Sequence, residues 1–308
     1  MLRAPKRIGR RIAMVVLLVM SASSAPLSKR VKASSGGDSD STGNSSSHAT
    51  LKPASASSPG IPFIEYDSQA EQQLLLLANQ ARAQAGAPLL TLDAGLSAAA
   101  REHAQAMFAE RQLSHQFEGE PSLPQRLAAA TRTQLDQEGE NVALDYDPAE
   151  AQRHLMLSPP HRANLLNANY NVVGLGVIRS GERLYIVQDF GHALPTYSVT
   201  EAKASIADAV ARSRHQTGQA QLPRRDLTVA DDAACSMAHA DKLDTSPVHQ
   251  LAQRYTVLTY TSLHPETLPQ GADQALASRN LRSFSVGACY ARTQTHLTGA
   301  YWVVLSLD

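Results

Sequence analysis

The stretch SPPHRANLLNANYNVVGLGV, residues 158–177, sets the fold around it. Two prolines end any preceding helix and fix the backbone entry into the next one, which places His161 in the first turn of a short helix. The apolar run that follows predicts a β-strand, and RLYIVQDFG at residues 183–191, after the turn SGE, predicts its hairpin partner. We interpret the fixed entry as a means of directing His161 into a small pocket.

Upstream of this stretch the sequence predicts four helices around the hairpin. Helical periodicity and end signals place them at 71–86 (with a capping box at Ser68 and Glu71, closed by Gly86), at 95–112, from Ser122, and from Asp147 to Leu157. Helices that flank a small antiparallel sheet indicate an α+β layered domain. We expect this domain to span residues 61–197.

The N-terminal segments have the composition of export and tether sequences. Residues 1–25 combine a basic start, a short apolar run and small residues, which predicts a signal peptide; an uncleaved membrane anchor is the alternative. Residues 26–60 are rich in Ser and Gly and predict a disordered linker. We therefore expect a secreted or cell-envelope protein whose mature chain has no transmembrane span. The 28 basic and 28 acidic residues balance, which argues against a nucleic-acid partner.

Residues 198–308 follow the plan of the first domain in a shorter form. Arg214 and Gly218 stand where Arg82 and Gly86 stand, and two β-runs resemble the earlier hairpin. A degenerate repeat is one interpretation, and an unrelated α+β piece is the other. In the repeat register one cysteine of this part lies on a helix and the other on the strand packed against it.

The two cysteines of the chain are Cys235 and Cys289. An exported chain with an even cysteine count predicts a disulfide between them, with two buried free thiols as the alternative.

Three polar residues stand out in the first domain. His115 follows the second helix in LSHQ, Glu140 follows a glycine in GENVA, and His161 opens the helix described above. Imidazole nitrogens and a carboxylate are common ligands of Zn²⁺ and other divalent metals, so the three form a candidate metal site or ligand-binding pocket. Glu140 is also the candidate general base of a metal-assisted hydrolase.

Each of the three also has a purely structural interpretation. His115 could bond the last carbonyls of its helix, Glu140 could pair with Arg162 or cap the next helix, and His161 could satisfy local backbone groups. His103, in the apolar stripe of the second helix, predicts a core histidine that is hydrogen-bonded to backbone rather than a ligand.

An ordered set of motifs resembles the CAP superfamily, the group of cysteine-rich secretory proteins, antigen 5 and plant pathogenesis-related proteins, in its bacterial SCP-like form. The motifs are the helical run at 74–107, LSHQ, GENVA, SPPHRANLL and VVGLGV, and the resemblance covers residues 68–195. It implies an α-β-α sandwich whose central cleft is lined by His115, Glu140 and His161, where some family members bind divalent metal. Animal and plant members have a second cleft glutamate, and Glu150 lies too early in its helix to match it.

Three functions are compatible with these features. The resemblance favours an exported protein that binds a small extracellular or lipid-like ligand, or a component of the cell envelope, with or without a divalent metal. The alternatives are a metal-assisted hydrolase of peptide or ester bonds and a structural cell-surface module. The sequence does not decide whether the protein is an enzyme. The C-terminal part has no counterpart of the three site motifs, so we expect no second site there.

Overall fold

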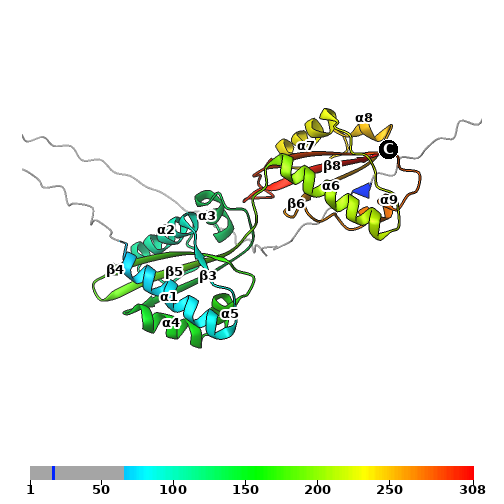
Figure 1. Ribbon diagram of the computed structural model, residues 1–308. Coiled ribbons are helices and arrows are strands. Elements are labelled where there is room, and N and C mark those ends of the chain that lie inside the picture. Colours follow the sequence, from blue (N-terminus) through cyan, green and yellow to red (C-terminus); the bar gives the residue numbers. More distant parts are fainter. Residues whose placement is uncertain (1–15, 18–65) are drawn as a thin grey trace, which may run out of the picture. The chain divides into compact units, whose positions relative to one another are not determined.

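The computed structural model describes residues 16–17 and 66–308 (Figure 1). The predicted signal peptide and linker lie outside the described residues, except for the two-residue strand β1 (Val16–Leu17), which pairs in parallel with β6 (Thr256–Ser262). None of the described helices has the length and apolar content needed to cross a membrane.

The part from residue 66 to 197 contains five helices and four strands among the described residues. They are α1 (Ser68–Ala85), β2 (Thr91–Leu92), α2 (Ala94–Glu110), α3 (Leu123–Ala130), β3 (Leu135–Asp145), α4 (Pro148–Leu157), α5 (Pro159–Leu166), β4 (Val172–Ser180) and β5 (Arg183–Ala193). The strands form one sheet in the order β2-β4-β5-β3, with β4, β5 and β3 antiparallel, so β3 is an edge strand.

Helices cover both faces of this sheet, which makes an α-β-α sandwich. On one face α1, α4 and α5 pack against Val173, Leu175 and Ile186 in one apolar cluster. On the other face α2 packs against Tyr185 and Val187 in a second cluster. Successive residues of β4 and β5 thus point to opposite layers, as the strand period requires. The predicted fold class is confirmed.

The predicted end signals place the helices of this part well, with one shift. Gly86 ends α1 in the left-handed conformation, and Asp147 caps α4, both as predicted. The N-cap of α1 is Asp67, whose carboxylate accepts from the backbone N–H of Ala70, and the predicted cap Ser68 is the first helical residue. The negative charge of an acidic cap also interacts favourably with the positive end of the helix dipole.

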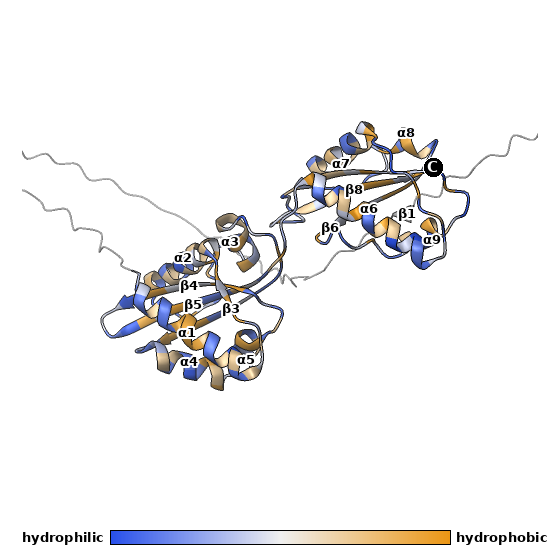
Figure 2. Cartoon of the chain, in the orientation of Figure 1, coloured by the Kyte–Doolittle hydropathy of each residue, from blue (hydrophilic) through white to orange (hydrophobic). Residues whose placement is uncertain are grey.

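The part from residue 198 to 308 is layered in the same way. Its elements are α6 (Val199–Gln216), α7 (Thr228–Ala240), α8 (His249–Ala252), β6, α9 (Ala272–Leu276), β7 (Phe284–Ala291) and β8 (Ala300–Leu307). The sheet order is β1-β6-β8-β7. One apolar cluster joins α6 and α9 to one face, and another joins α7 and α8 to the face that carries Trp302 and Val304. Figure 2 shows apolar and polar residues alternating along these helices.

A buried arginine holds each part together. Arg82 of α1 donates to the carbonyl of Pro88, in the loop after α1, and to three carbonyls at and after the end of α5, those of Leu165, Asn167 and Tyr170. Its side chain is fully buried, and burial lowers its pKa. The four carbonyls take up four of the five N–H donors of the guanidinium and offset part of its desolvation.

Arg214 of α6 makes the corresponding contacts in the second part. It donates to the carbonyls of Ala220, Leu276 and Ser278. The first acceptor lies six residues after the arginine in both parts. The other acceptors lie before β4 in the first part and before β7 in the second.

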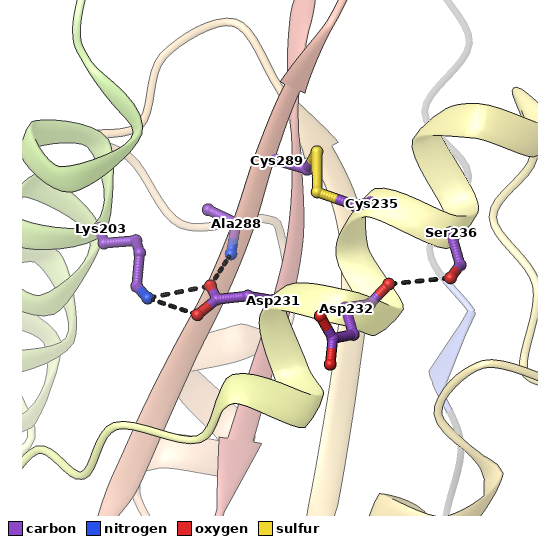
Figure 3. The surroundings of a disulfide bond; sticks show 7 residues. All are labelled: Lys203, Asp231, Asp232, Cys235, Ser236, Ala288 and Cys289. Carbon is purple, nitrogen blue, oxygen red and sulfur yellow. Dashed lines mark hydrogen bonds and ion pairs between the residues drawn. A yellow bond between two sulfur atoms is a disulfide. The ribbon is translucent and has the colours of Figure 1, made fainter.

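An ion pair links the first two helices of each part to a strand, with the charges exchanged. In the first part Glu71 of α1 pairs with Arg101 of α2 at 2.5 Å and also accepts from the backbone N–H of Val177. In the second part Lys203 of α6 pairs with Asp231 of α7 at 2.9 Å, and Asp231 accepts from the backbone N–H of Ala288 (Figure 3).

A glycine brings the second helix close to the sheet in both parts. A Cβ placed on Gly176 of β4 would overlap the backbone of Ala100 in α2, and one on Gly287 of β7 would overlap the backbone of Ala230 in α7. Only glycine allows this approach without moving a helix.

The predicted disulfide between Cys235 and Cys289 is present. It joins α7 to β7 with a Cα–Cα distance of 5.0 Å, and no described cysteine is free (Figure 3).

Candidate functional site

Glu140 lies on the edge strand β3, opposite Asp189 of β5, on the face of the sheet that α2 covers. Its side chain is only 3% exposed, and both of its oxygens are engaged. Oε1 lies 2.8 Å from Nδ1 of His115, and Oε2 lies 2.5 Å from Nη2 of Arg126. The sequence offered Arg162 as one candidate partner of Glu140; the structure places Glu140 in a strand, and its cationic partner is Arg126.

His115 is held by this carboxylate and remains open to solvent. Its side chain is 60% exposed, and Nδ1 donates to Glu140. This bond leaves Nε2 as the ring nitrogen that a ligand can reach. A carboxylate behind a histidine fixes the ring orientation and the tautomer.

A buried network beneath His115 fixes the loop that carries it. Arg126 of α3 donates to the carbonyls of His115 and Pro121 as well as to Glu140. His103 of α2 is fully buried, with Nε2 2.9 Å from the carbonyl of Ser114 and Nδ1 2.6 Å from Glu120. The prediction of a core histidine bonded to backbone is confirmed for His103.

His161 is the third residue of α5, in the helix entry that the two prolines fix. The side chain of Asn141 donates to its carbonyl, and the side chain of Asn164 donates to the carbonyl of Glu140 and to the amide oxygen of Asn141. These bonds tie the start of α5 to β3. Partial burial, and then the charge of nearby His115, lower the pKa of His161. The neutral form of the His161 ring is therefore favoured.

Asp189 is a buried acid that none of the sequence motifs indicated. Neither of its carboxylate oxygens has a hydrogen-bond partner among the described residues, and it is fully buried beside Glu140. Burial, followed by the negative charge of Glu140, raises its pKa well above the ordinary value. A neutral Asp189 leaves Glu140 as the charged partner of Arg126. In the sequence, the signal for Asp189 is an acidic residue inside the apolar run that forms β5.

The geometry does not assemble three metal ligands. Within the part of the chain that the structure describes, no group of three or more His, Cys, Asp or Glu residues is placed to hold a metal ion. Glu140 is fully occupied behind His115, so the groups open to a metal or another ligand are the imidazoles of His115 and His161. Glu150 takes no part, because it pairs with Arg153 at the surface.

Comparisons with known proteins place this region in context. Residues 75–190 match the model of the cysteine-rich secretory protein family, CAP. No curated protein matches the chain. Among solved structures, an extracellular SCP-domain protein from Bacillus anthracis is 27% identical with a TM-score of 0.37, and the match covers 41% of each chain.

Two further structures are similar. An outer surface protein from Borrelia burgdorferi is 17% identical with a TM-score of 0.40, over 42% of this chain and 99% of that one. NaASP2, solved with Zn²⁺, is 14% identical with a TM-score of 0.32, over 44% of this chain and 85% of that one.

Proposed function

We propose that residues 75–190, a domain of the CAP family, bind a small extracellular or lipid-like ligand through the imidazoles of His115 and His161. The supporting observation is the state of Glu140, whose two oxygens are committed to His115 and Arg126. This arrangement orients one imidazole and leaves its outer nitrogen free to hydrogen-bond a ligand. The ligand would reach the protein outside the cytoplasm, as the predicted signal peptide requires.

Exposed apolar side chains support a ligand with an apolar part. Leu113 precedes His115 by two residues and is 47% exposed, and Leu157 precedes His161 by four and is 70% exposed. A polar head held by the two imidazoles and an apolar body against such leucines would suit a lipid-like molecule.

The same geometry favours binding over metal-assisted hydrolysis. A general base must be within reach of a water molecule, and the Glu140 carboxylate is only 3% exposed, with one oxygen held by His115 and the other by Arg126. Ser114 offers no nucleophile, because its hydroxyl donates to the carbonyl of Gln116. A divalent metal, if bound, would have the two imidazoles as its protein ligands, with Glu140 behind one of them.

We infer further that residues 198–308 are a second copy of the CAP plan. The buried arginine, the ion pair between the first two helices and the glycine against the second helix recur at corresponding places, as described above. In both ion pairs the carboxylate also accepts from the backbone N–H of the residue that follows the glycine, Val177 in the first part and Ala288 in the second. This shared contact aligns the two sheets residue by residue.

In this alignment the second copy has an apolar residue where the first has Glu140. Val177 pairs with Ile186 on β5, and Ala288 pairs with Val303 on β8. Three residues further along β5 is Asp189, opposite Glu140; three residues further along β8 is Ser306, opposite Val257. The second copy would therefore act as a scaffold without a site.

The test is a binding titration of the full chain and its His115→Ala and His161→Ala variants. A fluorescent fatty acid serves as the lipid-like probe, and Zn²⁺ is titrated separately by calorimetry. His154→Ala is the matched control, because His154 is an exposed histidine of the same part, bonded to Asp145. We expect both site variants to lose affinity for the probe on the order of tenfold or more, the effect of losing a hydrogen bond to a ligand, while the control keeps it.

The outcomes separate the candidate functions. Equal affinity in all variants would contradict the assignment of the ligand to the two histidines, and no probe binding by the unsubstituted chain or the variants, with unchanged circular dichroism, would argue for a structural module. Hydrolysis of peptide or ester substrates that disappears in Glu140→Gln would favour the enzyme and contradict our interpretation of Glu140. Zn²⁺ binding that requires both histidines would assign the metal to this pair.

A further inference from the structure

The loop between β7 and β8, residues 292–299, bonds the part of the chain that carries the proposed site. Residues 66–308 belong to one compact unit, and this loop lies at the contact between its two parts. Nη1 of Arg292 lies 3.0 Å from the carbonyl oxygen of Thr131, and Nη2 donates to the carbonyl of Ala128. Two donors of one guanidinium thus meet the end of α3.

These two bonds complete the C-terminal end of a short helix. The last carbonyls of a helix have no partner within it, and a positive charge there interacts favourably with the helix dipole. Helix α3 has eight residues and no basic residue in its own last turn. Arg292 therefore supplies, from the C-terminal part, the cation that the end of α3 lacks.

The same loop also holds the first residues of β3. Oγ1 of Thr298 accepts from the backbone N–H of Leu135 at 3.1 Å and donates to the carbonyl of the same residue at 2.9 Å. The buried side chain of Gln134 donates to the carbonyl of Gly299 at 3.0 Å. The connection between α3 and β3 is therefore bonded at both of its ends by one loop.

Contacts within the C-terminal part fix the shape of this loop. Gly299 has a φ of 103°, which favours glycine, and a Cβ there would overlap the hydroxyl of Tyr290. That hydroxyl donates to the carbonyl of Thr298. Nε of Arg292 donates to the carbonyl of Leu297, so the guanidinium is held by its own loop as well as by α3.

The two elements that the loop bonds carry the groups whose contact supports the site. Arg126 lies on α3 and Glu140 lies on β3, and their charged atoms are 2.5 Å apart. Arg126 also donates to the carbonyl of His115, whose ring is held by Glu140. A shift of α3 relative to β3 would therefore alter the support behind the His115 ring.

We propose that Arg292 and Thr298 are positioning residues of the His115 site. From the C-terminal part they hold the end of α3 and the start of β3 in the arrangement that brings Arg126 to Glu140. This inference rests on the proposed function where it concerns ligand affinity, whereas the position of α3 can be measured without a ligand. The C-terminal part would thus complete the site of the first part.

Loss of the loop contacts should loosen α3 without unfolding the domain. Contacts within the first part also hold this helix, because Leu127 is buried against Leu96 and Ala99 of α2. We therefore expect a local effect on α3 and on the segment that carries His115. Helices α1 and α4 pack on the other face of the sheet and should not respond.

The test is hydrogen–deuterium exchange of the full chain, followed by mass spectrometry, for Arg292→Met and Thr298→Val. The first substitution removes the charged donors, and the second removes the hydroxyl while keeping the shape of the side chain. The amides of α3 and of residues 112–117 should exchange on the order of tenfold faster in Arg292→Met and roughly threefold faster in Thr298→Val, the scales of losing hydrogen bonds from a charged and a neutral group. Exchange in α1 and α4 should be unchanged.

Two control variants and a second readout sharpen the test. Arg282→Met removes an exposed arginine of the same part, paired with Asp308, and Thr298→Ser keeps the hydroxyl. Both should behave like the unsubstituted chain. The nitrogen-15 signals of the His115 ring report its tautomer in alkaline buffer: the form with the proton on Nδ1 should give way to a mixture in the two test variants and persist in the controls.

The outcomes decide this inference separately from the proposed function. Unchanged exchange in α3 with unchanged His115 signals would overturn it, and so would faster exchange spread evenly over α1 and α4. With the fluorescent fatty acid as probe, affinity should fall by roughly threefold to tenfold in the test variants, and constant affinity would overturn the positioning role. If the unsubstituted chain binds no probe, the proposed function fails, while the exchange and nitrogen-15 results still decide the role of Arg292 and Thr298.

Discussion

Arg126→Met should destabilise the protein strongly, because it leaves a buried carboxylate without its cation. The side chains of Arg126 and Glu140 are 5% and 3% exposed, and their charged atoms lie 2.5 Å apart. Removing one partner of a buried ion pair costs about 3–5 kcal/mol of unfolding free energy. With a urea dependence of about 1–3 kcal/mol per molar, the midpoint of urea unfolding should fall by at least about 1 M.

A double-mutant cycle isolates this interaction. Glu140→Gln in the Arg126→Met background removes the unpaired charge and should recover a large part of the lost stability. Arg153→Met is the matched control, because Arg153 and Glu150 form an exposed pair, with side chains 54% and 53% exposed, that should contribute at most about 1 kcal/mol. Equal midpoint shifts for Arg126→Met and Arg153→Met would refute the reasoning, as would additivity in the cycle.

Three other predictions concern the histidine pair, the helix approach and the exchanged charges. His161 should titrate below the ordinary histidine range by NMR, and His115→Ala should raise its pKa. Because the unfolded chain binds this proton more readily than the folded chain, His161 contributes stability above its unfolded pKa. That contribution is lost as the pH falls through the pKa of His161 in the folded state. Gly176→Ala should destabilise the fold by about 1–3 kcal/mol or more in urea unfolding, because the new methyl group overlaps the backbone of α2, and a smaller effect would contradict the close contact between α2 and β4. Glu71→Lys and Arg101→Asp should each destabilise, and together they should recover stability by reproducing the charge order of the C-terminal part; simple additivity would argue against equivalent ion pairs.

Most of the secondary structure followed from local signals. Proline, glycine and acidic caps mark the helix ends, because each acts on backbone groups within one turn of itself, and the hairpin β4–β5 carries its own turn. Strand β3 was missed. Its sequence LDQEGENVALD is largely polar, because β3 is an edge strand and many of its side chains form polar contacts or face solvent instead of packing in the core.

Three residues of the proposed site have local signals in the sequence, and the residues that support them in the structure do not. His115, Glu140 and His161 lie in short motifs with distinct local signals. Arg126 resembles any exposed helical arginine in sequence, and its contact with Glu140 arises only when α3 packs beside β3. Tertiary packing of this kind has no local signature, and the same is true of the pairing of Asp189 opposite Glu140.

Polar contacts on both faces of β3 restrict the substitutions that the strand tolerates. Glu140 points toward α2 and α3, while Asn141, the next residue, bonds α5 on the opposite side. A slip of one residue in the pairing with β5 would place the amide against Arg126 and bury the carboxylate under α5, so both layers would lose their polar contacts at once. Glu140, which orients His115 in the proposed site, therefore also defines the alignment of this strand. Variants selected for new binding specificity at Glu140 should consequently fail more often by misaligned strands than by weak binding.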